Sequence, residues 1–449
     1  MNAVRSAAVA GLFYPGDPKA LAAEVDELLG GVPRLAPQLG FPKALIVPHA
    51  GYIYSGAVAA HAYDELAAAR GVVRRVVLLG PVHRVPVRGL AAPAADWFAT
   101  PLGRIRIDRA AIAALSDLPQ VVSSDRAHAL EHSLEVQLPF LQKQLGEFDL
   151  VPFAVGDATV AEVAAVIERL WGGSETLLVI STDLSHYHAY DAARTIDAAT
   201  LARIAARATD LDHEEACGAT PLNGFLAVAG KRGIDVKLLA ACNSGDTAGG
   251  KGKVVGYSAF AAHEGGAVAP DQAGGTLLSI ARGAVESRLL GRPEPRFDSP
   301  WLAQAGASFV TLTRQGRLRG CIGSLAPTRP LAMDVAQNAL GAAFRDPRFK
   351  ALEAQEWAEC RVEVSLLSTP KPMRFADEAD LLAQIVPGED GLILEHEGRR
   401  GTFLPQVWEG IPDKQAFLRE LIKKAGLAPD TRLGRCKVSR YRVAKFHER

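Results

Sequence analysis

ALIVPHAGYIYSG, residues 44–56, decides the fold class, because an apolar run of strand type passes directly into a loop that carries His49. An apolar run without alternation is typical of a strand that is buried on both faces of a sheet. Further runs of this kind occupy residues 75–79, 150–155, 177–180 and 236–240, and helical segments separate them. This rhythm predicts an α/β domain with a mainly parallel sheet.

The composition is that of a globular chain without a strong charge bias. Of the 449 residues, 48% are hydrophobic and 22% charged, and Lys+Arg and Asp+Glu are both 50. We therefore expect no nucleic-acid partner. The five cysteines are odd in number and form no C-x-x-C pair, which favours a reducing, cytoplasmic location. No apolar run approaches the ~20 residues of a membrane span, so no membrane association is expected.

A change of composition at residues 263–275 predicts the domain boundary. Small and turn-forming residues replace the strand pattern there, before helical spacing resumes. We expect a first domain over residues 1–263, a linker over 264–275 and a second domain over 276–449.

Polar side chains follow several of the predicted strands at the point where each strand ends. Because ligands collect at the carboxyl ends of strands in open α/β sheets, we expect these side chains to form one site. In particular, the imidazoles of His49, His83 and His186 should converge in one cleft. The alternative is that they are separate surface or helix-capping histidines. The residues are His49, His83 in PVHR (81–84), Asp183 and His186 in STDLSHYH (181–188), and Cys242 and Asp246 in CNSGD (242–246).

The residue types point to metal chemistry. Two imidazoles, from His49 and His83, with one carboxylate or thiolate suit iron, copper or zinc and leave open positions for a ligand. Asp246 and Cys242 are the alternatives for the third ligand. A neighbouring carboxylate and imidazole at 183 and 186 could transfer protons, although the carboxylate at 183 could also merely cap the segment that follows it.

HALEH, residues 128–132, fits the H-x-x-E-H signature of inverted zinc peptidases. Read as a helix, the stretch places His128, His132 and Glu135 on one polar sector beside an apolar stripe that extends to residue 145. We expect His132 near the cleft, with a catalytic role, and His128 away from it. A peptidase would need a further glutamate ligand, and Pro139 interrupts a long helix. A zinc metallopeptidase is therefore a minor alternative.

Five blocks in this order resemble the Memo family, whose fold is similar to that of class III extradiol dioxygenases: VPHAGYIYSG (47–56), LGPVHR (79–84), EHSLEVQLPF (131–140), STDLSHYH (181–188) and GYSAFAA (256–262). The resemblance covers residues 5–263. It implies a metal held by His49, His83 and a residue of the CNSGDT loop, with His186 as acid or base. The third ligand is a cysteine in animal Memo proteins, whereas the nearest register here gives Thr247. The implied activity is that of a metal-dependent oxidoreductase with iron or copper, or zinc.

The second domain has a cysteine in an unusual setting. SFVTLTRQGRLRGCIGSL, residues 308–325, shows strand pattern on both sides of a turn, and Cys321 lies between Gly320 and Gly323, where backbone could approach a ligand. Arg317 and Arg319 precede it and would favour a thiolate. Cys321 is thus a candidate nucleophile or recognition site for an anionic or peptide ligand, and the alternative is a packing residue.

LRGCIGSL (318–325), AAFRDPRF (342–349), VEVSLLS (362–368), GTFLPQVW (401–408) and FLRELIKKAGL (417–427) resemble the AMMECR family, which implies a compact α+β domain. In prokaryotes both families are associated with a radical S-adenosylmethionine protein, which the resemblance implies as a partner. The chain has no C-x₃-C-x₂-C cluster motif, so radical chemistry would reside in another polypeptide. The alternative to an oxidoreductase is a non-catalytic adaptor that binds a metal, a small molecule or a peptide.

Overall fold

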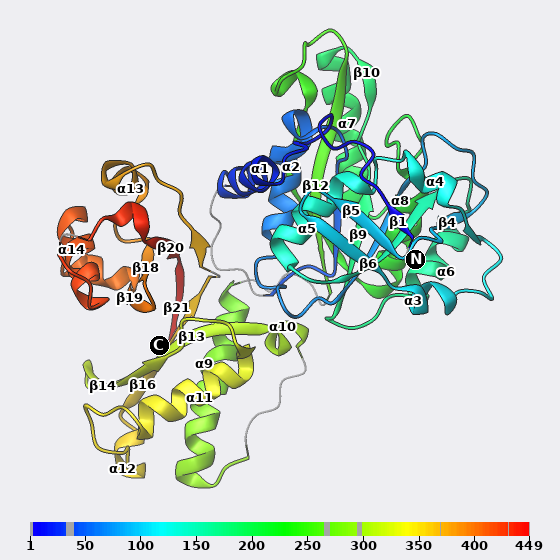
Figure 1. The fold of residues 1–449 in the computed structure, drawn as a ribbon. Coiled ribbons are helices and arrows are strands. Elements are labelled where there is room, and N and C mark those ends of the chain that lie inside the picture. Colours follow the sequence, from blue (N-terminus) through cyan, green and yellow to red (C-terminus); the bar gives the residue numbers. More distant parts are fainter. Residues whose placement is uncertain are drawn as a thin grey trace. The chain divides into compact units, whose positions relative to one another are not determined.

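The computed structural model describes residues 3–32, 40–264, 270–293, 299–368, 370–429 and 431–448. The chain forms two compact units, residues 1–33 with 41–267 and residues 34–40 with 268–449 (Figure 1). The first helix of the second unit begins at Pro270, so residues 270–275 of the expected linker are helical. Residues 265–269 of that linker lie outside the described residues.

The first unit is built around a 12-stranded sheet with the order β1-β5-β6-β8-β3-β9-β2-β12-β10, in which β11 pairs with β12 and β4 with β7 and β8. Its strands are β1 Val4–Arg5, β2 Ala44–Val47, β3 Arg75–Pro81, β4 Leu90–Ala92, β5 Trp97–Thr100, β6 Gly103–Ile107, β7 Val121–Ser123, β8 Asp149–Val155, β9 Thr176–Ser181, β10 His186–His188, β11 Asp235–Asn243 and β12 Val254–His263. Each of the five apolar runs expected as a strand lies within β2, β3, β8, β9 or β11.

Helices follow most of these strands. They are α1 Pro18–Gly30, α2 Tyr52–Asp64, α3 Arg109–Ala113, α4 Asp125–Ala129, α5 Leu138–Leu145, α6 Val160–Arg169, α7 Tyr190–Ala205 and α8 Ala219–Arg232, with 3-10 turns η1 Glu135–Gln137 and η2 Ser244–Asp246. The predicted α/β class with a mainly parallel sheet is confirmed, because β8, β3, β9 and β2 pair in parallel at the centre.

Alternate residues of the central strands face two separate cores, which explains the unbroken apolar runs. Leu45 and Val47 join one core together with residues of α1, α2 and α5, whereas Ala44 and Ile46 join the other with residues of α6 and α8. Helices therefore cover both faces of the sheet (Figure 1). A strand with helices on both faces has no solvent-facing side chain, which explains why its sequence shows no alternation of apolar and polar residues.

The parallel pairing also brings three loops to one edge of the sheet. Val47 at the end of β2 lies opposite Ser181 at the end of β9, and Leu79 near the end of β3 lies opposite Ile180. The loops after these strands carry His49, His83 and Asp183.

The segment after α4 does not continue the helix that a shared sector of His128, His132 and Glu135 would require. The helix α4 ends at Ala129, η1 begins only at Glu135, and α5 starts at Leu138 with Pro139 in its first turn. The expectation of one helical sector shared by His128, His132 and Glu135 is therefore wrong. The Glu131 carboxylate accepts backbone N–H groups of its own neighbours, which competes with helical hydrogen bonding.

The second unit contains two antiparallel sheets, of order β14-β13-β16-β21 with β15 beside β13, and β17-β20-β18-β19. Its elements are α9 Pro270–Leu290, α10 Pro300–Ala303, β13 Ala305–Arg314, β14 Arg317–Gly323, β15 Arg329–Pro330, α11 Leu331–Phe344, α12 Ala354–Trp357, β16 Cys360–Leu367, β17 Lys371–Pro372, α13 Glu378–Gln384, β18 Gly391–His396, β19 Arg399–Phe403, η3 Pro405–Glu409, α14 Lys414–Lys424, η4 Leu433–Arg435, β20 Lys437–Tyr441 and β21 Val443–His447.

Each sheet of the second unit has its own apolar core. Helices α9 and α11 pack on the first sheet around Val310, Val335 and Val364, and α14 packs on the second around Phe417 and Leu394. The predicted α+β class is confirmed for this unit. Among the described residues of the whole chain, no helix combines the length and the apolar character that crossing a membrane requires.

Candidate metal centre

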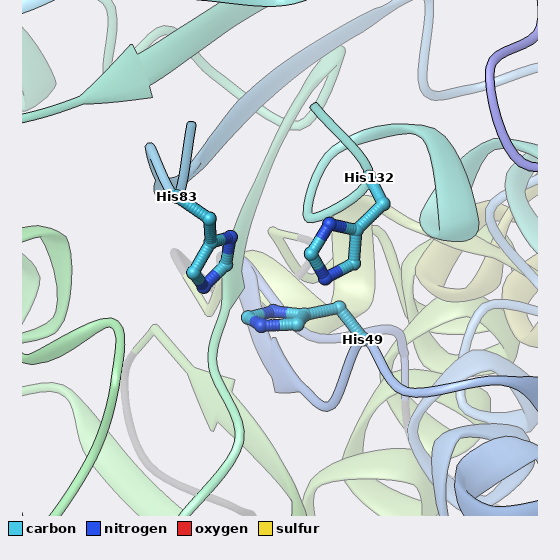
Figure 2. Close-up of side chains that lie close together, drawn as sticks. All are labelled: His49, His83 and His132. Atoms are coloured by element: carbon cyan, nitrogen blue, oxygen red, sulfur yellow. The ribbon is translucent and has the colours of Figure 1, made fainter. Parts of the chain in front are cut away.

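Three histidines of the first unit lie together at the carboxyl edge of the sheet. One ligand nitrogen from each of His49, His83 and His132 lies within 4.8 Å of the other two. The ring centroids are 5.2 Å apart for His49 and His83, 5.4 Å for His49 and His132, and 4.8 Å for His83 and His132 (Figure 2). His49 is buried, His132 half-buried and His83 exposed, so the group is open to solvent on the His83 side. A group of this kind could bind a metal ion.

The carboxylate of Glu131 holds two of these histidines in place. It accepts hydrogen bonds from the His83 backbone N–H at 2.6 Å and from the His132 and Ser133 N–H groups at 2.9 Å each. His83 Nδ1 lies 2.9 Å from Oε1 of the same carboxylate. Burial alone would raise the pKa of Glu131, but the hydrogen bond and the charge of the His83 ring lower it to about 2. An ionised carboxylate on Nδ1 leaves Nε2 of His83 as the nitrogen that can bind a metal.

A hydroxyl orients His49 in the same way. Its Nδ1 lies 2.9 Å from Ser181 Oγ, and Ser181 donates its own proton to the carbonyl of Ser133 at 2.7 Å. Since that hydroxyl has no second proton, His49 Nδ1 must be the donor, and Nε2 is unprotonated. Burial lowers the pKa of His49 well below its usual range, which keeps the ring in the neutral form that binds metals.

His132 has a ring nitrogen that the protein leaves unsatisfied. Nδ1 is buried and has no hydrogen-bond partner, although Glu131 Oε1 lies 3.4 Å away. Burial lowers the pKa of His132 to about 4, so the ring is neutral near pH 7. A neutral imidazole next to two oriented imidazoles fits a metal site.

Asp183 and His186 lie beside this group. Asp183 is buried, accepts the His49 backbone N–H at 2.7 Å, and has Oδ2 3.9 Å from His49 Nε2. Burial raises the pKa of Asp183 to about 7, against the hydrogen bonds from the backbone of His49 and Ala50. His186 begins β10 and is not a member of the group of three, although its charge interacts with those of His49 and His83.

The structure places the expected third ligands elsewhere. Asp246 accepts hydrogen bonds from the Tyr190 hydroxyl and, at 3.0 Å, from the Asn243 N–H, and Cys242 lies on β11 opposite Tyr257 of β12. Because β12 separates β11 from β2, the end of β11 is displaced from His49 by a strand. In the described residues His132 completes the group instead, from a loop that follows no strand.

Cys217 is a neighbour of the site that the sequence reasoning missed. Its Sγ lies 3.4 Å from His49 Nε2 and accepts the Asp183 backbone N–H at 3.3 Å. Burial, with a contribution from the Asp183 charge, raises the pKa of this thiol to about 12. Cys217 lies just before α8 and not after a strand, so the search of strand ends could not find it.

His128, the first histidine of HALEH, faces away from the group. Its Nε2 lies 2.8 Å from the carbonyl oxygen of Ala91, and its ring packs against Phe98 at 5.6 Å. The side chain is buried and belongs to the packing beneath β4. The two histidines of the H-x-x-E-H pattern therefore do not converge, and the structure gives no support to the zinc-peptidase alternative.

In the second unit, Cys321 lies on the edge strand β14. Thr311 Oγ1 donates to its thiol at 3.3 Å, its backbone N–H donates to Asp346 at 2.8 Å, and Arg348 lies 3.4 Å from its carbonyl. A side chain at Gly320 would meet the carbonyl oxygen of Ala342 at 2.1 Å. The absence of a side chain at Gly320 therefore allows the close approach of α11. This corrects the expectation that a ligand would approach the backbone there.

Gly323 has an equally local explanation, since a side chain there would meet the Phe309 ring at 2.2 Å. Arg319 pairs with Glu356 at 2.8 Å and not with the thiol. The second unit also has a cavity of about 500 Å³, whose lining includes Pro405, Gln406, Glu409, Arg442 and Lys445. Cys321 is not among its lining residues.

Two family patterns match the chain. Residues 5–261 match the family described as Memo-like protein, and residues 278–446 match AMMECR1. A MEMO1 family protein of Sulfolobus acidocaldarius is 34% identical over 283 residues, which cover 57% of this chain and 97% of that protein. A MEMO1 family protein of Aeropyrum pernix is 35% identical over 283 residues, with 57% of this chain and 98% of that protein covered.

Among solved structures, an uncharacterized protein from Pyrococcus horikoshii has 37% sequence identity and a TM-score of 0.36, over 39% of this chain and 91% of that one. The Memo-like pattern covers more than half of the chain, and the curated relatives match over almost their whole length. The chain belongs to the Memo-like protein family, and its second unit matches AMMECR1.

Proposed function

We propose that the first unit is a metal-dependent oxidoreductase whose centre is formed by His49, His83 and His132. The observation that carries this proposal is the convergence of three imidazole nitrogens within 4.8 Å. Imidazole ligands suit iron, copper and zinc, and three of them leave positions open for a further ligand. A bound iron or copper ion would supply a Lewis-acidic, redox-active position for a chelating substrate or oxygen.

The protein groups around the histidines support catalysis more than binding without turnover. Asp183 lies 3.9 Å from His49 Nε2, and burial raises its pKa to about 7, so it could hold or release a proton near neutral pH. His186 is the second candidate for proton transfer. Cys217, 3.4 Å from His49 Nε2, is the nearest additional donor, and a thiolate there would favour copper or zinc over iron.

The alternative is an adaptor that binds a metal, a small molecule or a peptide without turnover. The exposed position of His83 is compatible with it, because a partner could reach the group directly. A radical S-adenosylmethionine protein as that partner, or as a partner of the enzyme, is a proposal that rests on the family resemblance of both units.

Anaerobic reconstitution followed by elemental analysis tests the metal site. We expect a single iron or copper ion per chain, lost in His49→Ala, His83→Ala and His132→Ala but retained in His396→Ala, a histidine of the second unit. Oxygen uptake by the iron-loaded protein with an aromatic diol then separates the two functions. Uptake that disappears in His132→Ala supports the enzyme, and stoichiometric metal without any uptake supports the adaptor.

A further inference from the structure

The N-terminal segment, residues 5–14, touches the loop that carries His132 at several points. We propose that this segment is an integral part of the histidine site, with Arg5 and Glu135 as positioning residues for His132 and Phe13 as the wall that covers its ring. The inference rests on the proposed metal site, and it assigns to that site residues from outside the group of histidines and their direct partners.

Glu135 is the anchor of the segment. Its side chain is fully buried and pairs with the guanidinium of Arg5. It also accepts hydrogen bonds from the backbone N–H groups of Ala8 at 2.7 Å and Val9 at 3.0 Å, and from the Tyr14 hydroxyl at 2.6 Å. A buried carboxylate needs such donors, because an unpaired buried charge is costly. The segment is therefore tied to the chain only a few residues beyond His132.

The other donors of Arg5 bind backbone carbonyls that precede His132 in the chain. Nε donates to the carbonyl of His128 at 3.0 Å, and Nη2 donates to the carbonyl of Glu131 at 2.6 Å. The His128 carbonyl, in the last turn of α4, also accepts the backbone N–H of Glu131 at 3.3 Å, whereas Glu131 lies beyond the end of that helix. Arg5 thus fixes the backbone that leads into Glu131 and His132, while it is itself fixed by Glu135.

Phe13 completes the arrangement. Its ring lies 4.9 Å from the His132 ring, and its carbonyl accepts the backbone N–H of Tyr52 at 2.8 Å. Tyr52 begins α2, directly after the loop that carries His49. The segment therefore bridges the loops of two of the three histidines, and Phe13 packs against the His132 ring.

Three variants and one control distinguish a positioning role from an effect on stability alone. Glu135→Gln removes the charged anchor at nearly constant volume, and Phe13→Leu removes the wall. Lys43→Met serves as the control in the same unit, because the buried Lys43 ammonium donates to the carbonyls of Trp171, Gly173 and Thr176, at the opposite end of β2 from His49. Tyr14→Phe removes a single donor to Glu135 and remains available if Glu135→Gln does not fold.

The first readout needs no metal: the imidazole resonances of the three histidines in the apo protein by NMR. We expect Glu135→Gln and Phe13→Leu to shift the His132 resonances, and Lys43→Met to leave them in place while lowering the melting temperature. Tyr14→Phe should shift His132 less than Glu135→Gln. Unmoved His132 resonances in both Glu135→Gln and Phe13→Leu overturn the proposal.

The second readout is the affinity for Co²⁺ and the visible absorption spectrum of the Co²⁺ protein. Outer residues that orient ligands typically change metal affinity by 10–100-fold, and we expect about tenfold weaker binding in Glu135→Gln. An equal loss in Lys43→Met would show a stability effect and overturn the positioning role. If the wild type binds no Co²⁺, the proposed metal site fails, whereas the NMR result still decides the role of the segment.

Discussion

Replacing Glu131 by glutamine should weaken metal binding while leaving the fold intact. The carboxylate is buried and accepts four hydrogen bonds, two of which come from His83 and one from His132. Glutamine has nearly the same volume, but it exchanges one acceptor oxygen for an NH₂ donor that would face an N–H group. His83 then loses the partner that fixes its tautomer, and metal affinity should fall about 10–100-fold.

The same change removes a pH-dependent contribution of Glu131 to the free energy of unfolding. The folded pKa of Glu131, about 2, is below its ordinary value of 4.5, and this difference corresponds to roughly 3 kcal/mol. Because the folded pKa is depressed, this stability is fully present above pH 4.5 and is lost as the pH falls toward 2. In Glu131→Gln the loss should already be present at pH 7, and the decline between pH 4.5 and 2 should be weaker.

Competition titrations with a chelator measure the affinity, and urea unfolding of the apo protein between pH 7 and 3 measures the stability. Glu162→Gln is the matched control, because Glu162 also has a pKa near 2 but caps α6 away from the histidines. It should leave metal affinity unchanged. Wild-type affinity in Glu131→Gln would show that Glu131 does not orient His83.

Three further outcomes follow from the described contacts. His132→Ala should abolish metal binding and His128→Ala should retain it, as measured by elemental analysis; equal losses would contradict the separation of these two rings. Burial lowers the pKa of His128 to about 4, so as the pH falls this ring is protonated in the unfolded chain before it is protonated in the folded one. The free energy of unfolding should therefore fall by roughly 3 kcal/mol as the pH drops from about 6.5 to 4. That fall in unfolding free energy should be smaller in His128→Gln, and an identical pH profile would count against it. Gly320→Ala should destabilise by about 1–3 kcal/mol in urea unfolding, because its new side chain would overlap the Ala342 carbonyl. Gly434→Ala, which meets no atom within 4 Å, should be nearly neutral, and equal effects would refute the overlap.

The central sheet and the positions of two histidines could be predicted because both follow from periodicity. Strands buried on both faces read as unbroken apolar runs, and parallel pairing places the ends of β2 and β3 at one edge. His49 and His83 follow these ends directly, so the pattern that gives the strands also gives the convergence of the two side chains.

The third histidine could be suspected but not placed. His132 lies in a stretch whose conformation is set by the Glu131 side chain and by Arg5, which is far away in sequence. Helical periodicity in the leucines beyond it is real for α5 but does not extend back to His132. Long-range side-chain hydrogen bonds leave no periodic signal, and the same holds for Cys217, whose contact with His49 spans many elements.

In the second unit the strand pattern around Cys321 correctly predicted two strands, but the glycines beside it wrongly indicated room for a ligand. Gly320 and Gly323 have the same permissive character whether a ligand, a helix or an aromatic ring approaches them, and only the fold shows that α11 and Phe309 do. Sequence alone cannot distinguish these causes, since each requires only the absence of a side chain.

X-ray absorption spectroscopy of the reconstituted protein tests the three-histidine centre, because it reports the ligands of the bound metal itself. We expect three imidazole nitrogens at about 2.0–2.1 Å, the distance typical of zinc. His132→Ala should hold no metal and therefore give no such signal, and His128→Ala should keep all three imidazoles. A spectrum with fewer than two imidazoles, or one that does not change in His132→Ala, would contradict the proposed centre.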